Sequence, residues 1–212
     1  MIKKLILFGL FLIFLPPGSF GENSSKWVNG TAAIINKKVI SIQDAFVYRA
    51  LQRAKTGMQP VILEEEGDDL RKTVQKIVFE EMVIAEMKNL GKEFNVQSEV
   101  AKWISGQRGG ALEAVKKKYG LTEQDISRKM ANTLAADRFV QLKIETVTPV
   151  ITEEESQKYF KRNEAQFRGK SFESIKPNII VLLKKQAVQK NLEEWIKSLK
   201  DKYEVSMLLD NG

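Results

Sequence analysis

Residues 33–44 read AIINKKVISIQD and predict two short strands, the turn between them and the start of a helix. Two β-branched pairs flank the polar Asn36-Lys37-Lys38, an arrangement typical of strands joined by a tight turn. Ser41 then predicts the N-cap of a helix over residues 41–55, and Asp44, three residues later, completes an approximate capping box. A small β element is therefore expected to lead directly into a helix.

Beyond this helix the chain has helical periodicity almost throughout. Apolar residues at helical spacing, with glycines or N-cap residues between the segments, predict helices over residues 68–90, 98–104, 111–119, 122–147, 152–166 and 171–199. Ser98 and Thr152 are the expected N-caps of two of them. Residues 204–209 alternate as a strand does and are expected to pair with the first strand. The predicted fold class is mainly α, with a small β element that pairs strands near the two termini.

Residues 1–21 have the layout of a cleaved secretory signal peptide. Two lysines precede an apolar run over residues 5–15, and small residues stand at the expected cleavage site after Gly21. The run is shorter than the roughly 20 residues that a membrane-spanning helix needs, so no stable membrane insertion is expected. Export would place the mature chain, residues 22–212, in a bacterial periplasm. The absence of cysteine, which excludes disulfides, fits that compartment better than a eukaryotic secreted domain.

The sequence contains no histidine and no cysteine. This removes the commonest general base, the thiol nucleophile and the usual zinc ligands. Gly169-Lys170-Ser171 imitates the end of a phosphate-binding loop, but Glu164 stands where that motif requires a glycine. No cofactor, metal or nucleotide is therefore expected, and the chain is predicted not to be an enzyme. A serine and a lysine brought together by the fold stay an open alternative.

The mature chain carries a modest positive charge. Without the two lysines of the predicted signal peptide, 32 basic residues (34 − 2) face 27 acidic ones, a net charge of +5. A surplus this small, spread along the chain, is not the footprint of a nucleic-acid-binding protein, so no nucleic-acid partner is expected.

Three segments resemble the SurA-type periplasmic chaperones. Residues 33–44 resemble the strand, turn and helix start that open their N-terminal domain, and residues 151–167 resemble the helix that leads into their parvulin prolyl-isomerase domain. Residues 172–205 resemble the helix and strand that follow that domain. The resemblance implies a multi-helix SurA N-terminal-like fold over residues 22–212, similar to the peptide-binding domains of trigger factor and SurA.

Only four residues, 168–171, stand where an isomerase domain would sit in the fuller family members. The junction at residues 148–170 therefore lacks the parvulin domain, and no prolyl-isomerase activity is carried over. The resemblance implies an ATP-independent periplasmic chaperone that binds unfolded or partly folded envelope proteins, outer-membrane proteins in particular. The alternative is a structural or assembly factor for one dedicated cell-envelope partner.

A chaperone of this kind needs an apolar surface that its own core does not use. Aromatic residues and methionines that do not fall on a buried stripe are the candidates for client binding, and each is alternatively an ordinary core residue. These residues are Trp27, Phe46, Tyr48, Met58, Met87, Trp103, Tyr119 and Phe167. A homodimer formed by exchange of terminal strands or helices is left open.

Overall fold

The computed structural model describes residues 30–56, 58, 68–107 and 110–209. The predicted signal peptide and Trp27 lie outside these residues. Within residues 22–212, predicted as one domain, the described residues divide into two compact units. Unit 1 comprises Lys143–Ile196, and unit 2 comprises the described residues of Glu22–Leu142 and Lys197–Gly212.

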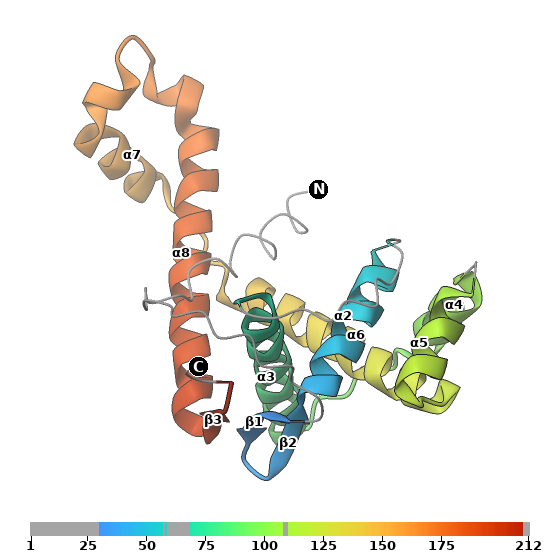
Figure 1. The fold of residues 1–212 in the computed structure, drawn as a ribbon. Helices are drawn as coiled ribbons and strands as arrows, with labels where there is room; N and C mark the ends of the chain where they lie inside the picture. Colours follow the sequence, from blue (N-terminus) through green and yellow to red (C-terminus); the bar gives the residue numbers. More distant parts are fainter. Residues whose placement is uncertain (1–29, 57, 59–67, 108–109, 210–212) are drawn as a thin grey trace. The chain divides into compact units, whose positions relative to one another are not determined.

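Unit 2 contains a three-stranded antiparallel sheet that joins the two ends of the described chain (Figure 1). Its strands are β1 (Thr31–Ile35), β2 (Lys38–Ser41) and β3 (Val205–Met207), in the order β2-β1-β3. Ile35 is paired with Lys38 on one side and with Val205 on the other. The predicted pairing of strands near the two termini is confirmed.

The turn between β1 and β2 is tied to the residue that precedes β3. Asn36 adopts a left-handed φ of 52°, a conformation that asparagine tolerates better than most residues. Its backbone N–H donates to the Glu204 carbonyl at 2.7 Å, and the Glu204 N–H donates to the Asn36 Oδ1 at 3.2 Å. One side chain in the turn therefore contributes to the closure of the sheet.

Five helices complete unit 2, and the prediction of a mainly helical fold is confirmed. They are α2 (Ile42–Lys55), α3 (Asp68–Asn89), α4 (Gln97–Gly106), α5 (Ala111–Tyr119) and most of α6 (Glu123–Val147). Buried residues of α2, α4, α5 and α6 and of the α4 N-cap form one cluster, consisting of Val47, Leu51, Val96, Val100, Leu112, Ile126 and Met130. This cluster is the part of the core on which the short helices α4 and α5 pack.

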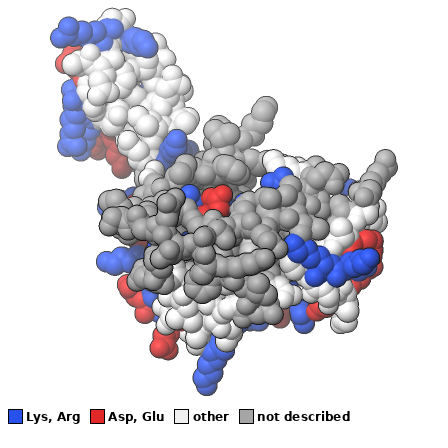
Figure 2. Space-filling view, in the orientation of Figure 1, with Lys and Arg blue, Asp and Glu red and all other residues white. Residues whose placement is uncertain are grey.

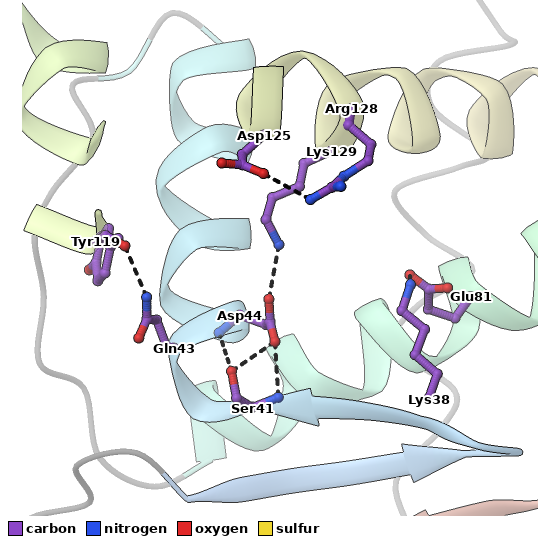
Figure 3. Close-up of polar contacts among 9 residues, drawn as sticks. All are labelled: Lys38, Ser41, Gln43, Asp44, Glu81, Tyr119, Asp125, Arg128 and Lys129. Atoms are coloured by element: carbon purple, nitrogen blue, oxygen red, sulfur yellow. Dashed lines mark hydrogen bonds and ion pairs between the residues drawn. The ribbon is translucent and has the colours of Figure 1, made fainter. Parts of the chain in front are cut away.

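Local polar chemistry fixes the start of α2 (Figure 3). The Ser41 hydroxyl accepts from the Asp44 N–H at 3.0 Å, and the Asp44 carboxylate accepts from the Ser41 N–H at 3.1 Å, which is the predicted capping box. Lys129 of α6 donates to the other Asp44 oxygen at 2.9 Å. Although burial opposes ionisation, these contacts together hold the pKa of Asp44 below its ordinary value.

The predicted start of α4 at Ser98 is wrong. The N-cap is Val96, and Ser98 lies inside the helix as an exposed residue. Val96 is buried in the core cluster, with 2% of its surface exposed. Packing of an apolar side chain, rather than a capping hydroxyl, positions this end of α4.

Replacing Ser41 with alanine is expected to lower the free energy of unfolding by about 1 kcal/mol, because the Asp44 N–H at the α2 terminus loses its hydroxyl acceptor. The same change at Ser98 is the matched control and is expected to alter stability by less than about 0.5 kcal/mol. Urea unfolding followed by circular dichroism measures both. Equal losses for the two variants would contradict the structural difference between these serines.

Unit 1 consists of the last turn of α6, α7 (Glu153–Arg162), the 3-10 turn η2 (Glu164–Phe167) and most of α8 (Phe172–Lys202). The helix predicted over residues 152–166 is thus divided at Asn163. The Asn163 side chain donates to the Tyr159 carbonyl at 2.8 Å and competes with the helical hydrogen bonds there. The predicted long helix from residue 172 is confirmed, and it continues through Pro177 without ending.

Candidate binding surface

The α7, η2 and α8 segment of unit 1 is held in place by caps and by the glycine at its turn. Thr152 and Glu155 form the predicted capping box of α7, and the Thr152 N–H and hydroxyl lower the pKa of Glu155. Gly169 has a φ of +79°, which permits the tight return from η2 into α8. Only Arg168 to Ser171 separate η2 from α8, and Glu153 of α7 pairs with Lys176 of α8, so the chain folds back on itself here. Residues 150–185 are called the unit 1 hairpin.

Four aromatic rings meet in this hairpin. The rings of Phe160 and Phe167 are stacked at a centroid distance of 5.6 Å, and Phe172 meets Phe160 edge-on at 5.7 Å. Tyr159 lies 6.3 Å from Phe167. All four rings stay partly exposed. The rings therefore form an aromatic cluster that stabilises the turn while presenting part of its own surface to solvent.

The first half of α8 contains more apolar surface than unit 1 buries. Ile179 begins the run Ile-Ile-Val-Leu-Leu over residues 179–183, which is apolar on every side of the helix. Of these five residues only Ile179 is buried, at 2% exposure, whereas Val181 and Leu182 are 55% and 37% exposed. The buried stripe resumes at Val188. A helix that is apolar all round is ordinarily covered all round, and this one is not.

Val150 adds to the same region. Asn191 of α8 donates to the Val147 carbonyl at 2.9 Å, and Lys176 pairs with Glu153 at 2.9 Å. These two contacts hold both ends of the segment between α6 and α7 against α8. Val150 lies within this segment and is 87% exposed.

Figure 2 shows the unit 1 hairpin with a broad uncharged face and with Lys and Arg along its outer end and edge. We call the exposed apolar side chains of this hairpin the hairpin surface. It consists of Val150, Tyr159, Phe160, Phe167, Phe172, Ile180, Val181, Leu182 and Leu183. Five apolar residues of unit 2 are comparably exposed, but they are distributed over separate elements: Val39, Met58, Leu90, Leu142 and Leu208.

Among the candidate residues predicted from the sequence, Phe167 lies in the hairpin surface, in its aromatic cluster. Met58 is 55% exposed and follows α2, and Phe46 is partly buried in α2. Trp27 lies outside the described residues. The structure therefore brings only one of the eight predicted residues into this surface.

Three other candidates contribute to the core of unit 2, which is the alternative that the sequence left open for each of them. Met87 is buried in α3, at 8% exposure. Trp103 and Tyr119 are partly exposed and pack against the buried cluster of α2, α4, α5 and α6, beside other large side chains such as Phe94. Tyr119 also accepts a hydrogen bond from Gln43 at its backbone carbonyl (Figure 3).

Tyr48 belongs to a half-buried polar cluster instead. Its hydroxyl and that of Thr133 hydrogen-bond to Glu80, the latter at 2.9 Å. Burial raises the pKa of Glu80 to about 7, and the nearby charges of Asp137 and Glu81 act in the same direction. Burial also raises the pKa of the Tyr48 phenol, which therefore stays protonated and donates. The cluster connects α2, α3 and α6, and its hydrogen bonds account for its place in the structure.

The described residues contain neither a candidate metal site nor a membrane-spanning helix. No group of three acidic side chains among them is arranged to hold a metal ion. Within the same residues, every helix is too short or too polar to cross a bilayer.

The sequence did not single out the other residues of the hairpin surface, which are Val150, Tyr159, Phe160, Phe172, Ile180, Val181, Leu182 and Leu183. The run of five apolar residues at 179–183 was the available indication, because such a run cannot fit within one buried stripe of a helix. Comparison with known proteins adds no further assignment: no protein-family model and no curated protein matches the chain.

Proposed function

We propose that this chain is an ATP-independent chaperone that holds unfolded polypeptides, outer-membrane proteins in particular, on the hairpin surface of unit 1. The observation that carries the proposal is the exposure of Val150, Val181 and Leu182 beside a partly exposed aromatic cluster, all within one hairpin. Exposed apolar surface concentrated in one segment marks a site for another molecule, since soluble proteins otherwise cover it.

The expected strength of binding fits holding rather than permanent capture. Covering the exposed part of an aliphatic side chain contributes about 1 kcal/mol, and the hairpin surface offers only a few such side chains and four aromatic edges. After the cost of ordering an unfolded segment, affinities on the order of micromolar follow. A client would therefore exchange on and off the surface without an energy source.

The SurA-type resemblance supports the same proposal and suggests the periplasm as the compartment. The four residues between η2 and α8 leave no room for an isomerase domain, so the proposed chaperone acts without prolyl-isomerase activity. The resemblance and the hairpin surface are independent grounds, one from sequence and one from exposure.

The test is aggregation of a urea-diluted outer-membrane barrel protein, followed by light scattering, with the purified chain at near-stoichiometric ratio and no nucleotide. The chain is expected to slow aggregation severalfold. No effect from a chain that is folded by circular dichroism would sink the proposal. Capture of one folded envelope protein, together with indifference to unfolded chains, would favour a dedicated assembly factor instead.

The double variant Val181→Ser/Leu182→Ser locates the surface. It removes two exposed side chains worth about 1 kcal/mol each, so the chaperone concentration needed for half suppression is expected to rise about thirtyfold. The matched control is Leu90→Ser/Leu208→Ser, which removes two equally exposed leucines from unit 2 and is expected to leave that concentration unchanged. Equal effects of the two double variants would show that the hairpin surface is not the client-binding site.

A further inference from the structure

Most of the acidic side chains around the hairpin surface form contacts within the hairpin, whereas most of the basic side chains form no ion pair with another described residue. Residues 153–185 contain eight Lys or Arg and five Glu, a net charge of +3 (8 − 5). Glu153 pairs with Lys176 at 2.9 Å, Glu154 pairs with Lys158 at 2.6 Å, and Glu155 closes the α7 capping box. Three of the five acidic groups are therefore engaged within the hairpin itself.

The remaining basic groups are exposed, and none of them forms an ion pair with another residue in the part of the chain that the structure describes. They are Lys161, Arg162, Arg168, Lys170, Lys184 and Lys185. Glu155, Glu164 and Glu173 form no ion pair by the same measure, so the unpaired surplus is +3 (6 − 3), equal to the net charge.

These cations follow three apolar parts of the hairpin surface in turn. Tyr159 and Phe160 are followed by a basic pair at 161–162, and Phe167 by basic residues at 168 and 170. The apolar run at 179–183 is followed by Lys184 and Lys185. These three apolar parts therefore each have two positive charges beside them in the chain, whereas Val150 precedes Glu153 to Glu155 and Phe172 precedes Glu173. Figure 2 shows Lys and Arg, with some Asp or Glu, at the rim of the uncharged face.

We infer that the hairpin surface selects unfolded segments whose apolar residues are flanked by Asp or Glu. The inference rests on the proposed function and names the class of client. Exposed charges at the rim of an interface act mainly on the rate of association and on the choice of partner, while the apolar centre supplies affinity. A segment with flanking carboxylates satisfies both parts of the hairpin surface, whereas a basic segment of equal hydrophobicity is repelled.

The test uses three fluorescein-labelled peptides of one length with identical apolar and aromatic residues, flanked by four Asp, four Ser or four Lys. Fluorescence anisotropy with the full chain is expected to give affinities in the order Asp, Ser, Lys. The Asp and Lys peptides are expected to differ at least tenfold at 50 mM NaCl and much less at 500 mM, where screening shortens the range of the charges to a few ångströms.

In the variant Lys184→Gln/Lys185→Gln, the ratio of the affinity for the Asp peptide to the affinity for the Lys peptide is expected to fall about threefold. The affinity for the Ser peptide is expected to stay unchanged. The matched control is Lys92→Gln/Lys117→Gln, which removes two exposed lysines of unit 2 and is expected to keep the full ratio. Circular dichroism establishes that both variants are folded.

The possible failures are distinguishable. Equal affinity for the three peptides would overturn the charge selection and leave the proposed function standing. No binding of any peptide would overturn the proposed function together with this inference. Phosphatidylglycerol vesicles that displace the Asp peptide, while phosphatidylcholine vesicles do not, would assign the surface to anionic membranes and overturn the choice of a polypeptide.

Discussion

Replacing Glu80 with glutamine is expected to raise the free energy of unfolding by about 2 kcal/mol at pH 8 and to leave it nearly unchanged at pH 4. The buried Glu80 carboxyl has a pKa of about 7 in the folded chain, against an ordinary value of 4.5. Below pH 4.5 the group is protonated in both states. Between pH 4.5 and 7 it ionises in the unfolded chain first, so stability falls as the pH rises.

The size of this effect follows from the shift. A difference of 2.5 units (7 − 4.5) corresponds to about 3.4 kcal/mol, which partial exposure of the side chain reduces to about 2 kcal/mol. Glutamine is always neutral, and its amide oxygen can accept from Thr133 and Tyr48 as the carboxyl does. The loss of stability between pH 4.5 and 7 should therefore become smaller in the variant.

Glu81→Gln is the matched control for this prediction. Glu81 is the next residue of α3 and pairs with exposed Lys38 at 2.6 Å (Figure 3). Losing a pair of this kind costs less than about 1 kcal/mol, and no gain in stability at pH 8 is expected. Urea unfolding at pH 4, 6 and 8 measures both variants. A Glu80→Gln variant that is less stable than the parent at pH 8 would show that the carboxylate is a favourable partner there.

Replacing Trp103 with alanine is expected to lower the free energy of unfolding by about 3 kcal/mol without a specific loss of client holding. Trp103 packs against the buried cluster that joins α2, α4, α5 and α6, so its removal leaves a cavity beside that cluster. The measurement pairs urea unfolding with the aggregation assay, performed at a temperature where the variant stays folded. The suppression of aggregation by the variant is expected to match that of the parent.

Phenylalanine at the same position separates packing from polar effects. The Trp103 Nε1 is buried and has no hydrogen-bond partner among the described residues. Removing that N–H offsets part of the lost volume, so Trp103→Phe is expected to cost less than about 1.5 kcal/mol. A folded Trp103→Ala variant with aggregation suppression reduced tenfold would return Trp103 to the client-binding surface, as first predicted from the sequence.

Local chemistry explains which elements could be predicted from the sequence. The capping boxes at Ser41 and Thr152 need only residues three apart, and the helix stop at Gly91 needs only a residue that adopts a φ of +60°. The prediction of the start of α4 was wrong because packing in the core of unit 2 positions Val96, and a few neighbouring residues of sequence do not reveal that packing. The division of the predicted helix at Asn163 also depends on a side chain that competes for backbone carbonyls.

The candidate surface was harder to predict than the fold for a physical reason. Helical spacing places Met87 and Phe167 on helices or turns but does not say whether a neighbouring element covers them. Met87 is covered, and Phe167 stays partly open. Exposure depends on packing between elements that are distant in sequence. For that reason only the run at 179–183 indicated from the sequence that apolar side chains stay exposed, because the run is wider than one buried stripe of a helix.

The central place of β1 in the sheet has a consequence for the time course of folding. Ile35 pairs with Val205, 170 residues further along the chain (205 − 35), whereas its pairing with β2 needs only the turn at Asn36. Contacts over such separations form slowly, because a large loop must close first. During synthesis β1 therefore waits with the hydrogen-bonding edge opposite β2 unoccupied, and that edge is open to pairing with a second chain until β3 is made.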